Sequence, residues 1–162
     1  MDIIIRQAYI DDLDSVAKIE SICFPMAQAA TRESLEQRIN TFSKSFFVAE
    51  IDRKIIGFIN GCIINGTVIH DKLYEDYTLH IQNGDYQTIF GLYVIPDYSN
   101  IGVATQLMNH MIEVSRLADH KGVILTCKDK LIHFYEKFGY VNKGISKSEH
   151  GGAEWYDMIL EF

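Results

Sequence analysis

Residues 90–105 place a strand end, a short turn and a helix start next to one another. The apolar run of residues 89–95 favours a β-strand, and Pro96 ends it because proline donates no hydrogen bond to a ladder. After a polar turn, apolar residues recur at three- and four-residue steps from Gly102, which predicts a helix to about Ala118. Unpaired backbone N–H groups and the positive end of a helix dipole then meet at one point. Such a point binds anions, above all phosphates.

A second segment, residues 125–140, carries a phenol that is able to do chemistry. Asp129 caps a helix predicted over residues 130–138, and Gly139 ends it. Tyr135 lies on the apolar face of this helix, so periodicity alone favours a core residue. A phenol has a pKa of about 10, so it is protonated at neutral pH and can protonate a leaving group. Both interpretations of Tyr135 stay open at this point.

The histidines and cysteines are weaker candidates for chemistry. The six histidines, at positions 70, 80, 110, 120, 133 and 150, include no i, i+4 pair and no cysteine partner at zinc-ligand spacing, so no metal site is expected. Ser99 and Cys127 lack the surroundings of a recognisable nucleophile. The cysteines are odd in number and scattered, which indicates reduced thiols and not a disulfide framework.

Length and composition indicate one globular domain. A chain of 162 residues suits a single core, and no linker or internal repeat divides it, so residues 1–162 are expected to form one domain. The net charge of −7 argues against nucleic-acid binding and is compatible with a cationic substrate. The longest apolar stretch, residues 55–64, is too short to cross a bilayer, and the first residues lack a signal-peptide pattern. We therefore expect a cytoplasmic protein without a membrane partner.

The remaining periodicity places the other elements. Strands are predicted over residues 3–8, 46–51, 55–64, 123–127, 141–148 and 154–162, and helices from residue 11 or 12 to 23 and from 31 to 42. Residues 65–84 are polar and aperiodic, which is typical of a functional loop. The order of elements, with about seven strands and helices on both faces, predicts an α+β fold with a mixed sheet.

Three features in combination are similar to one enzyme family. They are Val94-x-Pro96 at a strand end, Gly102-Val-Ala104 at a helix start, and Phe134-Tyr135-x-x-Phe138-Gly139-Tyr140. Over nearly the whole chain this pattern resembles the GCN5-related N-acetyltransferase (GNAT) family. Within that family, Asp71-Lys-Leu, Leu79-His80, Asn83-Gly84 and Leu125-x-Cys127-x-Asp129 are similar to the serotonin (arylalkylamine) N-acetyltransferase branch.

The resemblance implies a fold in which two central parallel strands splay apart around acetyl-CoA. The pantetheine arm would pair with the backbone of Leu92, Tyr93 and Val94. The pyrophosphate would bind backbone N–H groups of the turn and helix start, which are Asn100, Ile101, Gly102, Val103, Ala104 and Thr105. The family usually has Arg or Gln where this chain has Ser99, so we expect weaker cofactor binding but not its loss. Further charge could come from Lys128, Lys130 or Lys143.

The resemblance also assigns Tyr135 as the general acid that protonates the departing CoA thiolate. An alkylamine with a pKa of about 10.4 is only about one part in 10³ neutral at pH 7, so the acceptor needs a base or a water chain. The serotonin branch uses a histidine pair whose positions here hold Thr88 and Phe90, and neither is a base. His80 and His70 are the nearest histidines along the chain. Carboxylates that could hold the ammonium are Glu33, Glu75 and Asp76, although surface roles stay open for each.

We therefore predict a GNAT-like N-acetyltransferase that moves an acetyl group from acetyl-CoA to a primary amine by direct attack in a ternary complex. An arylalkylamine or another small amine is the expected acceptor, with substrate positions Phe24, His80, Thr88 and Phe90. Aromatic walls are expected from Phe58, Tyr74 and Tyr77. The resemblance also brings His150 and Trp155 near the pocket, although ordinary turn and core roles stay open for both and are favoured. Two alternatives stay open, a family member that acts on a protein or peptide amine and a non-catalytic acyl-CoA-binding module. Monomer and homodimer are equally open.

Overall fold

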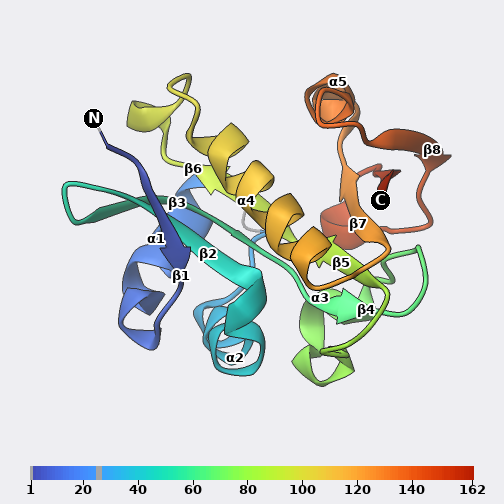
Figure 1. The fold of residues 1–162 in the computed structure, drawn as a ribbon, viewed down its shortest axis with the longest axis horizontal. Helices are drawn as coiled ribbons and strands as arrows, with labels where there is room; N and C mark the ends of the chain where they lie inside the picture. The colour runs from blue at the N-terminus through green and yellow to red at the C-terminus, as the bar shows by residue number, and fades with distance from the viewer. Residues whose placement is uncertain (1, 25–26) are drawn as a thin grey trace.

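The computed structural model describes residues 2–24 and 27–162, which form two sheets with helices around them (Figure 1). One sheet has the strand order β1-β2-β3-β6 and is antiparallel throughout. The other has the order β4-β5-β7-β9-β8, in which β5 and β7 run parallel. This is the mixed α+β architecture that the order of elements predicts.

The bounds of the elements are as follows. The strands are β1 (Ile4–Gln7), β2 (Phe46–Ile51), β3 (Lys54–Asn60), β4 (Ile63–Ile64), β5 (Tyr86–Ile89), β6 (Gly91–Val94), β7 (Gly122–Cys127), β8 (Val141–Ile145) and β9 (Tyr156–Glu161). The helices are α1 (Leu13–Cys23), α2 (Arg32–Phe42), α3 (Lys72–Glu75), α4 (Val103–Leu117) and α5 (Ile132–Glu136). Short 3-10 turns are found at Ile10–Asp12, Ser43–Ser45, Tyr77–Leu79, Pro96–Tyr98, Asp129–Leu131 and His150–Gly152.

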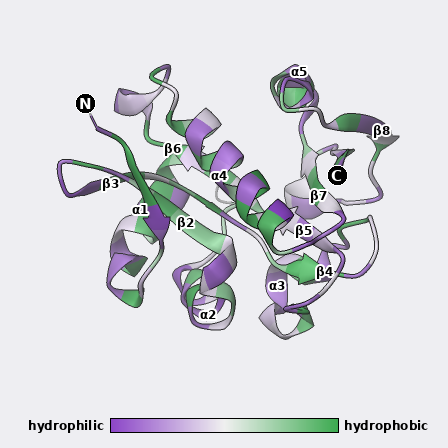
Figure 2. Ribbon diagram, in the orientation of Figure 1, coloured by the Kyte–Doolittle hydropathy of each residue, from purple (hydrophilic) through white to green (hydrophobic). Residues whose placement is uncertain are grey.

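Strand β2 explains why helices cover both faces of the first sheet. Phe46 and Val48 belong to a core cluster with residues of α1 and α2, whereas Phe47, Ala49 and Ile51 belong to a cluster with residues of α4. Because successive side chains of a strand point to opposite faces, both faces of β2 are apolar and both must be covered. Hydrophobic and hydrophilic colours alternate along α4 in Figure 2, as expected for a helix that buries one side.

The apolar run expected as one strand over residues 89–95 is two strands in different sheets, so that prediction was wrong. β5 ends at Ile89, which pairs with Leu125 of β7. β6 begins at Gly91, which pairs with Asn60 of β3 in the other sheet. Local periodicity carries no information on which neighbour a strand pairs with, so the break at Phe90 left no trace in the pattern. The break separates the central parallel strands, as the family resemblance implies.

A second break divides the stretch expected as one strand over residues 55–64. β3 ends at Asn60, and β4 belongs to the other sheet. A side chain on Gly61 would collide with the backbone carbonyl of Thr88, so the two chain segments approach too closely there for any residue but glycine. The two breaks account for the nine strands of the described residues, where about seven were expected.

The other predicted elements differ from the structure mainly in length. The helix expected over residues 130–138 is a 3-10 turn followed by α5, and the last two strands are shorter than expected. The polar segment of residues 65–84 contains α3 and one 3-10 turn. Within residues 2–24 and 27–162, no helix combines the length and the apolar character that crossing a membrane requires.

Candidate active site

The two sheets part after Ile89 and Leu125, and a cleft of about 980 Å³ lies between β6 and the end of β7. The loop from α1 to α2, the segment around α3 and the loop from β8 to β9 also line it, so segments far apart in the sequence share one wall. β6 is the edge strand of its sheet and pairs with β3 on one side only. The backbone groups on its other edge are therefore available to a ligand, apart from the Val94 carbonyl, which accepts a hydrogen bond from Sγ of Cys23 at 3.5 Å.

The backbone positions expected to contact CoA fall into two groups. Leu92, Tyr93 and Val94 line the cleft along the free edge of β6, whereas residues 100–105 form the turn into α4 and do not line it. Gly102 caps α4 with a φ of 87°, a conformation that favours glycine. The first N–H group bonded within this helix, over the part of the chain that the structure describes, is that of Gln106, 3.0 Å from the carbonyl of Gly102. The N–H groups before it remain available to an anion.

Tyr135 lies on α5 and lines the cleft beside the end of β7. It also belongs to the main core cluster and is only 8% exposed. Burial raises the pKa of its phenol, and the neighbouring Cys127 thiol adds to this shift. The phenol therefore stays protonated across the physiological range, so Tyr135 can donate a proton but cannot act as a base there. Tyr135 is therefore both a residue of the hydrophobic core and a residue of the cleft wall.

The four positions expected to contact the acceptor divide into two pairs. Phe24 and Phe90 line the cleft, whereas Thr88 and His80 do not. Thr88 is fully buried in β5, and its hydroxyl group donates to the carbonyl of Cys62 at 2.9 Å. Its side chain therefore supports the pairing of β5 with the chain after β3.

His80 holds the polar insertion in place beside β4. Its Nδ1 accepts a hydrogen bond from the N–H of Ile63 at 3.0 Å, and its Nε2 lies 2.9 Å from Oε1 of Gln82. Because Nδ1 accepts, the proton of the neutral imidazole is on Nε2 and is donated to Gln82. Burial lowers the pKa of His80, which agrees with a neutral ring. Both ring nitrogens are thus engaged away from the cleft.

The remaining residues singled out by the sequence are split between the cleft and other places. Those that line the cleft are Tyr74, Glu75, Lys128, Lys130, His150 and Trp155; those that do not are Glu33, Phe58, His70, Asp76, Tyr77, Ser99 and Lys143. Among the residues that the structure describes, no group of three or more His, Cys, Asp or Glu side chains is arranged to hold a metal ion.

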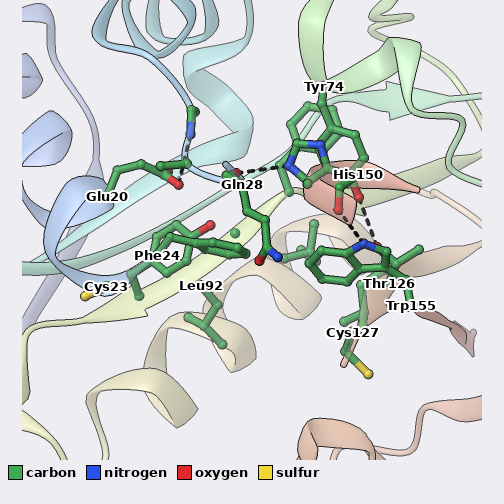
Figure 3. Close-up of a pocket in the computed structure, with 18 of the residues that line it drawn as sticks. Glu20, Cys23, Phe24, Gln28, Tyr74, Leu92, Thr126, Cys127, His150 and Trp155 are labelled. Carbon is green, nitrogen blue, oxygen red and sulfur yellow. Dashed lines mark hydrogen bonds between the residues drawn. The ribbon is translucent and has the colours of Figure 1, made fainter. Parts of the chain in front are cut away.

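Hydrogen bonds and stacked rings tie three loops together over one side of the cleft (Figure 3). The Tyr74 hydroxyl group lies 3.0 Å from Oγ1 of Thr126, and its ring stacks on His150 with the centroids 4.7 Å apart. Nε2 of His150 donates to the carbonyl of Gln28 at 3.0 Å, because a carbonyl only accepts. The indole N–H of Trp155 donates to the carbonyl of His150 at 2.9 Å. The loop from β8 to β9 is thereby fixed against the loop from α1 to α2.

Two buried charged residues line the cleft, and neither was singled out by the sequence analysis. Glu20 on α1 is 2% exposed and Arg38 on α2 is 5% exposed. Burial raises the pKa of Glu20 and lowers that of Arg38. Helical spacing did contain a signal, because Glu20 lies four residues after the buried Val16 and Arg38 three residues after the buried Leu35. A charge on the buried stripe of a helix is unusual unless it is paired or functional.

Comparisons with known proteins agree with this geometry. The family model described as "Acetyltransferase (GNAT) family" matches residues 13–140. The N-alpha-acetyltransferase of Sulfurisphaera tokodaii is 25% identical over 160 residues, which cover 96% of this chain and 89% of that protein. The probable hydrolase YhcX of Bacillus subtilis is 24% identical over 167 residues, which cover 98% of this chain; the chain spans only 32% of that relative's length. The solved GphF GNAT-like decarboxylase in complex with isobutyryl-CoA has a TM-score of 0.84 at 21% identity, with 98% of each chain covered.

Proposed function

Because the chain belongs to the acetyltransferase (GNAT) family, we propose that it transfers an acetyl group from acetyl-CoA to a primary amine. The observation that carries the proposal is a protonated phenol, Tyr135, on the wall of a cleft at the point where the central parallel strands part. The narrower likeness to the serotonin branch stays a prediction.

Acetyl-CoA would bind backbone groups along this cleft and at the turn into α4. The amide groups of its pantetheine arm would pair with the free edge of β6 at Leu92, Tyr93 and Val94, as an added strand would. The pyrophosphate would meet the N–H groups at the start of α4, where the helix dipole favours negative charge. The cations Lys128 and Lys130 line the same cleft and would attract the remaining phosphate charge.

The reaction needs one proton removed and one supplied. The neutral amine attacks the thioester carbonyl carbon, a C–N bond forms, and the C–S bond breaks with its electron pair on sulfur. The nitrogen, which is positively charged after the attack, releases one proton to solvent and becomes the amide nitrogen. Tyr135 gives its proton to this thiolate, which then leaves as the thiol of CoA. Solvent returns a proton to the phenolate, and burial favours that step because it disfavours the charged form.

The experiment that tests the proposal is a measurement of thiol release from acetyl-CoA across a panel of amines, with CoA binding followed separately by calorimetry. Acetylation of any primary amine, identified by the mass of the product, supports the proposal. Binding of CoA with no acetylated amine across arylalkylamines, polyamines, amino acids and peptides would instead support a non-catalytic acyl-CoA-binding module.

One observation favours a second candidate, the decarboxylation of an acyl-CoA that carries a carboxylate. Arg38, Lys128 and Lys130 place three cations on the cleft wall, and one solved structure of this fold is named a GNAT-like decarboxylase. Loss of CO₂ from malonyl-CoA, with protonation of the resulting carbanion, would leave acetyl-CoA. Mass spectrometry of malonyl-CoA incubated without an amine decides between the two, because only decarboxylation produces acetyl-CoA under that condition.

A further inference from the structure

Glu20 and Arg38 are opposite charges buried in one cleft without a direct ion pair between them. Each contributes to the pKa shift of the other, so they lie close enough to interact. In the described chain, however, no Glu20 oxygen lies within 4.0 Å of an Arg38 nitrogen. Buried charges are normally paired directly, because otherwise the cost of removing them from water is not offset. Both side chains line the same cleft, so polar groups of a ligand bound there could pair with each of them.

Arg38 has hydrogen-bonding capacity that the protein does not use. Its Nη1 donates to Oδ1 of Asn60 and its Nη2 donates to the carbonyl of Tyr74, each at 3.0 Å, and both acceptors are neutral. The ring of Phe90 covers the guanidinium with its centroid 4.7 Å from the Cζ atom. A guanidinium has five N–H donors, so an oxygen of a ligand in the cleft has donors available to it. Nδ2 of the buried Asn60 also has no hydrogen-bond partner among the described residues.

Glu20 is a carboxylate held in place for a cation. Its Oε2 accepts a hydrogen bond from the N–H of Ala30 at 3.2 Å, and the neighbouring Tyr93 side chain acts against the rise in the pKa of the carboxyl group. Figure 3 shows Glu20 at the side of the cleft where Phe24 lies. Arg38 also acts against the rise in the pKa of Glu20, and Glu20 in turn joins burial in raising the pKa of the Cys23 thiol. Because burial raises the pKa of Glu20, it is a stronger base than an exposed carboxylate.

We infer that the acceptor is an α-amino group, an amine whose adjacent carbon carries a carbonyl or carboxylate group, and that its ammonium binds Glu20 while an oxygen of that group binds Arg38. This inference rests on the proposed function and names the acceptor class. Glu20 takes one proton from the ammonium, and the amine lone pair that is freed attacks the thioester. The α-amino group of a polypeptide has a pKa of about 7.7–8.0, against about 10.4 for an alkylamine, so it loses its proton more readily in a site that lacks the histidine pair.

The test compares acceptors that share one side chain and differ in the oxygen. Phenethylamine lacks the carbonyl or carboxylate oxygen, whereas phenylalaninamide carries a neutral carbonyl. Phenylalanine carries a carboxylate, and a tripeptide that starts with phenylalanine carries a peptide carbonyl. Rates are expressed per neutral amine so that the difference in amine pKa does not contribute. The inference predicts a kcat/KM about 10- to 100-fold higher for the oxygen-bearing acceptors, the range expected of a hydrogen bond to a charged group. The phenylalanine and tripeptide arms separate a free amino acid from a polypeptide N-terminus.

Variants assign the preference to the two charges. Arg38→Lys is expected to reduce the ratio between phenylalaninamide and phenethylamine to near one, while Arg116→Lys on the exposed side of α4 leaves it unchanged. Glu20→Gln is expected to lower kcat/KM for every amine by about 100-fold at pH 7, with the loss shrinking as pH rises and the amine deprotonates unaided. Glu113→Gln, also exposed on α4, is its control.

The outcomes separate this inference from the proposed function. Equal rates per neutral amine for phenethylamine and phenylalaninamide, or a ratio that Arg38→Lys does not change, overturn the inference and leave acetyl transfer to amines intact. A protein that binds CoA and acetylates none of the four acceptors, nor any other amine, overturns both. If Arg38→Lys no longer binds CoA, the wild-type ratio alone decides.

Discussion

Ile89 and Leu125 are the last residues that face each other across the parallel strands β5 and β7. Two residues further on, Gly91 already pairs with Asn60 in the other sheet. The cleft begins at this point, and the residues that follow the pair on both strands line it.

Tyr135→Phe is expected to lower kcat by a factor of about 10² to 10⁴, the usual contribution of a general acid, with CoA affinity unchanged. Thiol release and calorimetry measure the two effects, and Tyr9→Phe on the exposed surface is the matched control. Since burial raises the pKa of Tyr135 above the ordinary value, wild-type activity should show no loss from ionisation of this phenol below about pH 10. An unchanged kcat in Tyr135→Phe would remove its role as the acid.

Gly102→Ala should weaken CoA binding as well as the fold. Gly102 has a φ of 87° and Gly66 a φ of 102°, and neither has an atom within 4 Å of an added Cβ. Alanine at either site is strained, at a cost of about 1–2 kcal/mol in the free energy of unfolding. Only Gly102 precedes the N–H groups of α4, so calorimetry should show a loss of CoA affinity in Gly102→Ala and not in Gly66→Ala. Equal CoA affinity in the two variants would place the pyrophosphate elsewhere.

Gly151→Ala should impair acceptor binding and spare CoA binding. A Cβ on Gly151 would collide with Cγ of Gln28 and disturb the contact between the loop from β8 to β9 and the loop from α1 to α2. Gly152 also has a positive φ but has no atom within 4 Å of an added Cβ. Steady-state kinetics should therefore show a higher KM for the amine in Gly151→Ala than in Gly152→Ala, with similar melting temperatures. A KM that rises equally in both would attribute the effect to backbone strain alone.

The ion pair between Arg6 and Asp12 should make stability depend on pH. Burial raises the pKa of Asp12, but the two hydrogen bonds from Arg6, each at 2.9 Å, and one from the N–H of Tyr9 outweigh it and lower the pKa below 3.8. A carboxyl group whose pKa is lower in the native than in the unfolded state stabilises the fold at pH values above the unfolded pKa. This contribution to stability is lost as the pH falls through the native pKa. Asp12→Asn should therefore cost about 1–3 kcal/mol in the free energy of unfolding at pH 7 and progressively less below pH 3.8.

Urea unfolding at several pH values measures this effect, with Asp14→Asn as the control. The Asp14 carboxylate also pairs with an arginine, Arg32, but its side chain is 84% exposed. Exposed pairs contribute little, so Asp14→Asn should cost well under about 1 kcal/mol at any pH. A penalty in Asp12→Asn that does not vary with pH would contradict the assignment to the ion pair.

Elements whose pattern is local were predictable from the sequence. β2 has the expected bounds, and Thr31 accepts a hydrogen bond from the N–H of Ser34 at the start of α2, as an N-cap should. The fold class followed from the order of such elements. The breaks at Phe90 and Gly61 were not predicted as strand ends, because the partner of each strand is decided by the packing of distant segments.

The candidate site was less predictable than the fold. Tyr135 and β6 were identified through motifs, and the structure places both on one cleft. Glu20 and Arg38 lie on helices with an ordinary amphipathic pattern, and their burial depends on how α1 and α2 pack beside the cleft. His80 illustrates the opposite error, since this histidine of the polar insertion was a candidate by its position along the chain, but its ring accepts a hydrogen bond from the N–H of Ile63 in β4 and does not line the cleft.

Phe90 is the single residue between β5 of one sheet and β6 of the other. A thioester substrate that occupies the gap beside it, as proposed, would hold both sheets at once, so neither sheet could open without ejecting the substrate. Ligation of the native state then raises the free energy of unfolding with the logarithm of substrate concentration. Resistance of this protein to heat and to proteolysis would accordingly follow the supply of its own acyl donor.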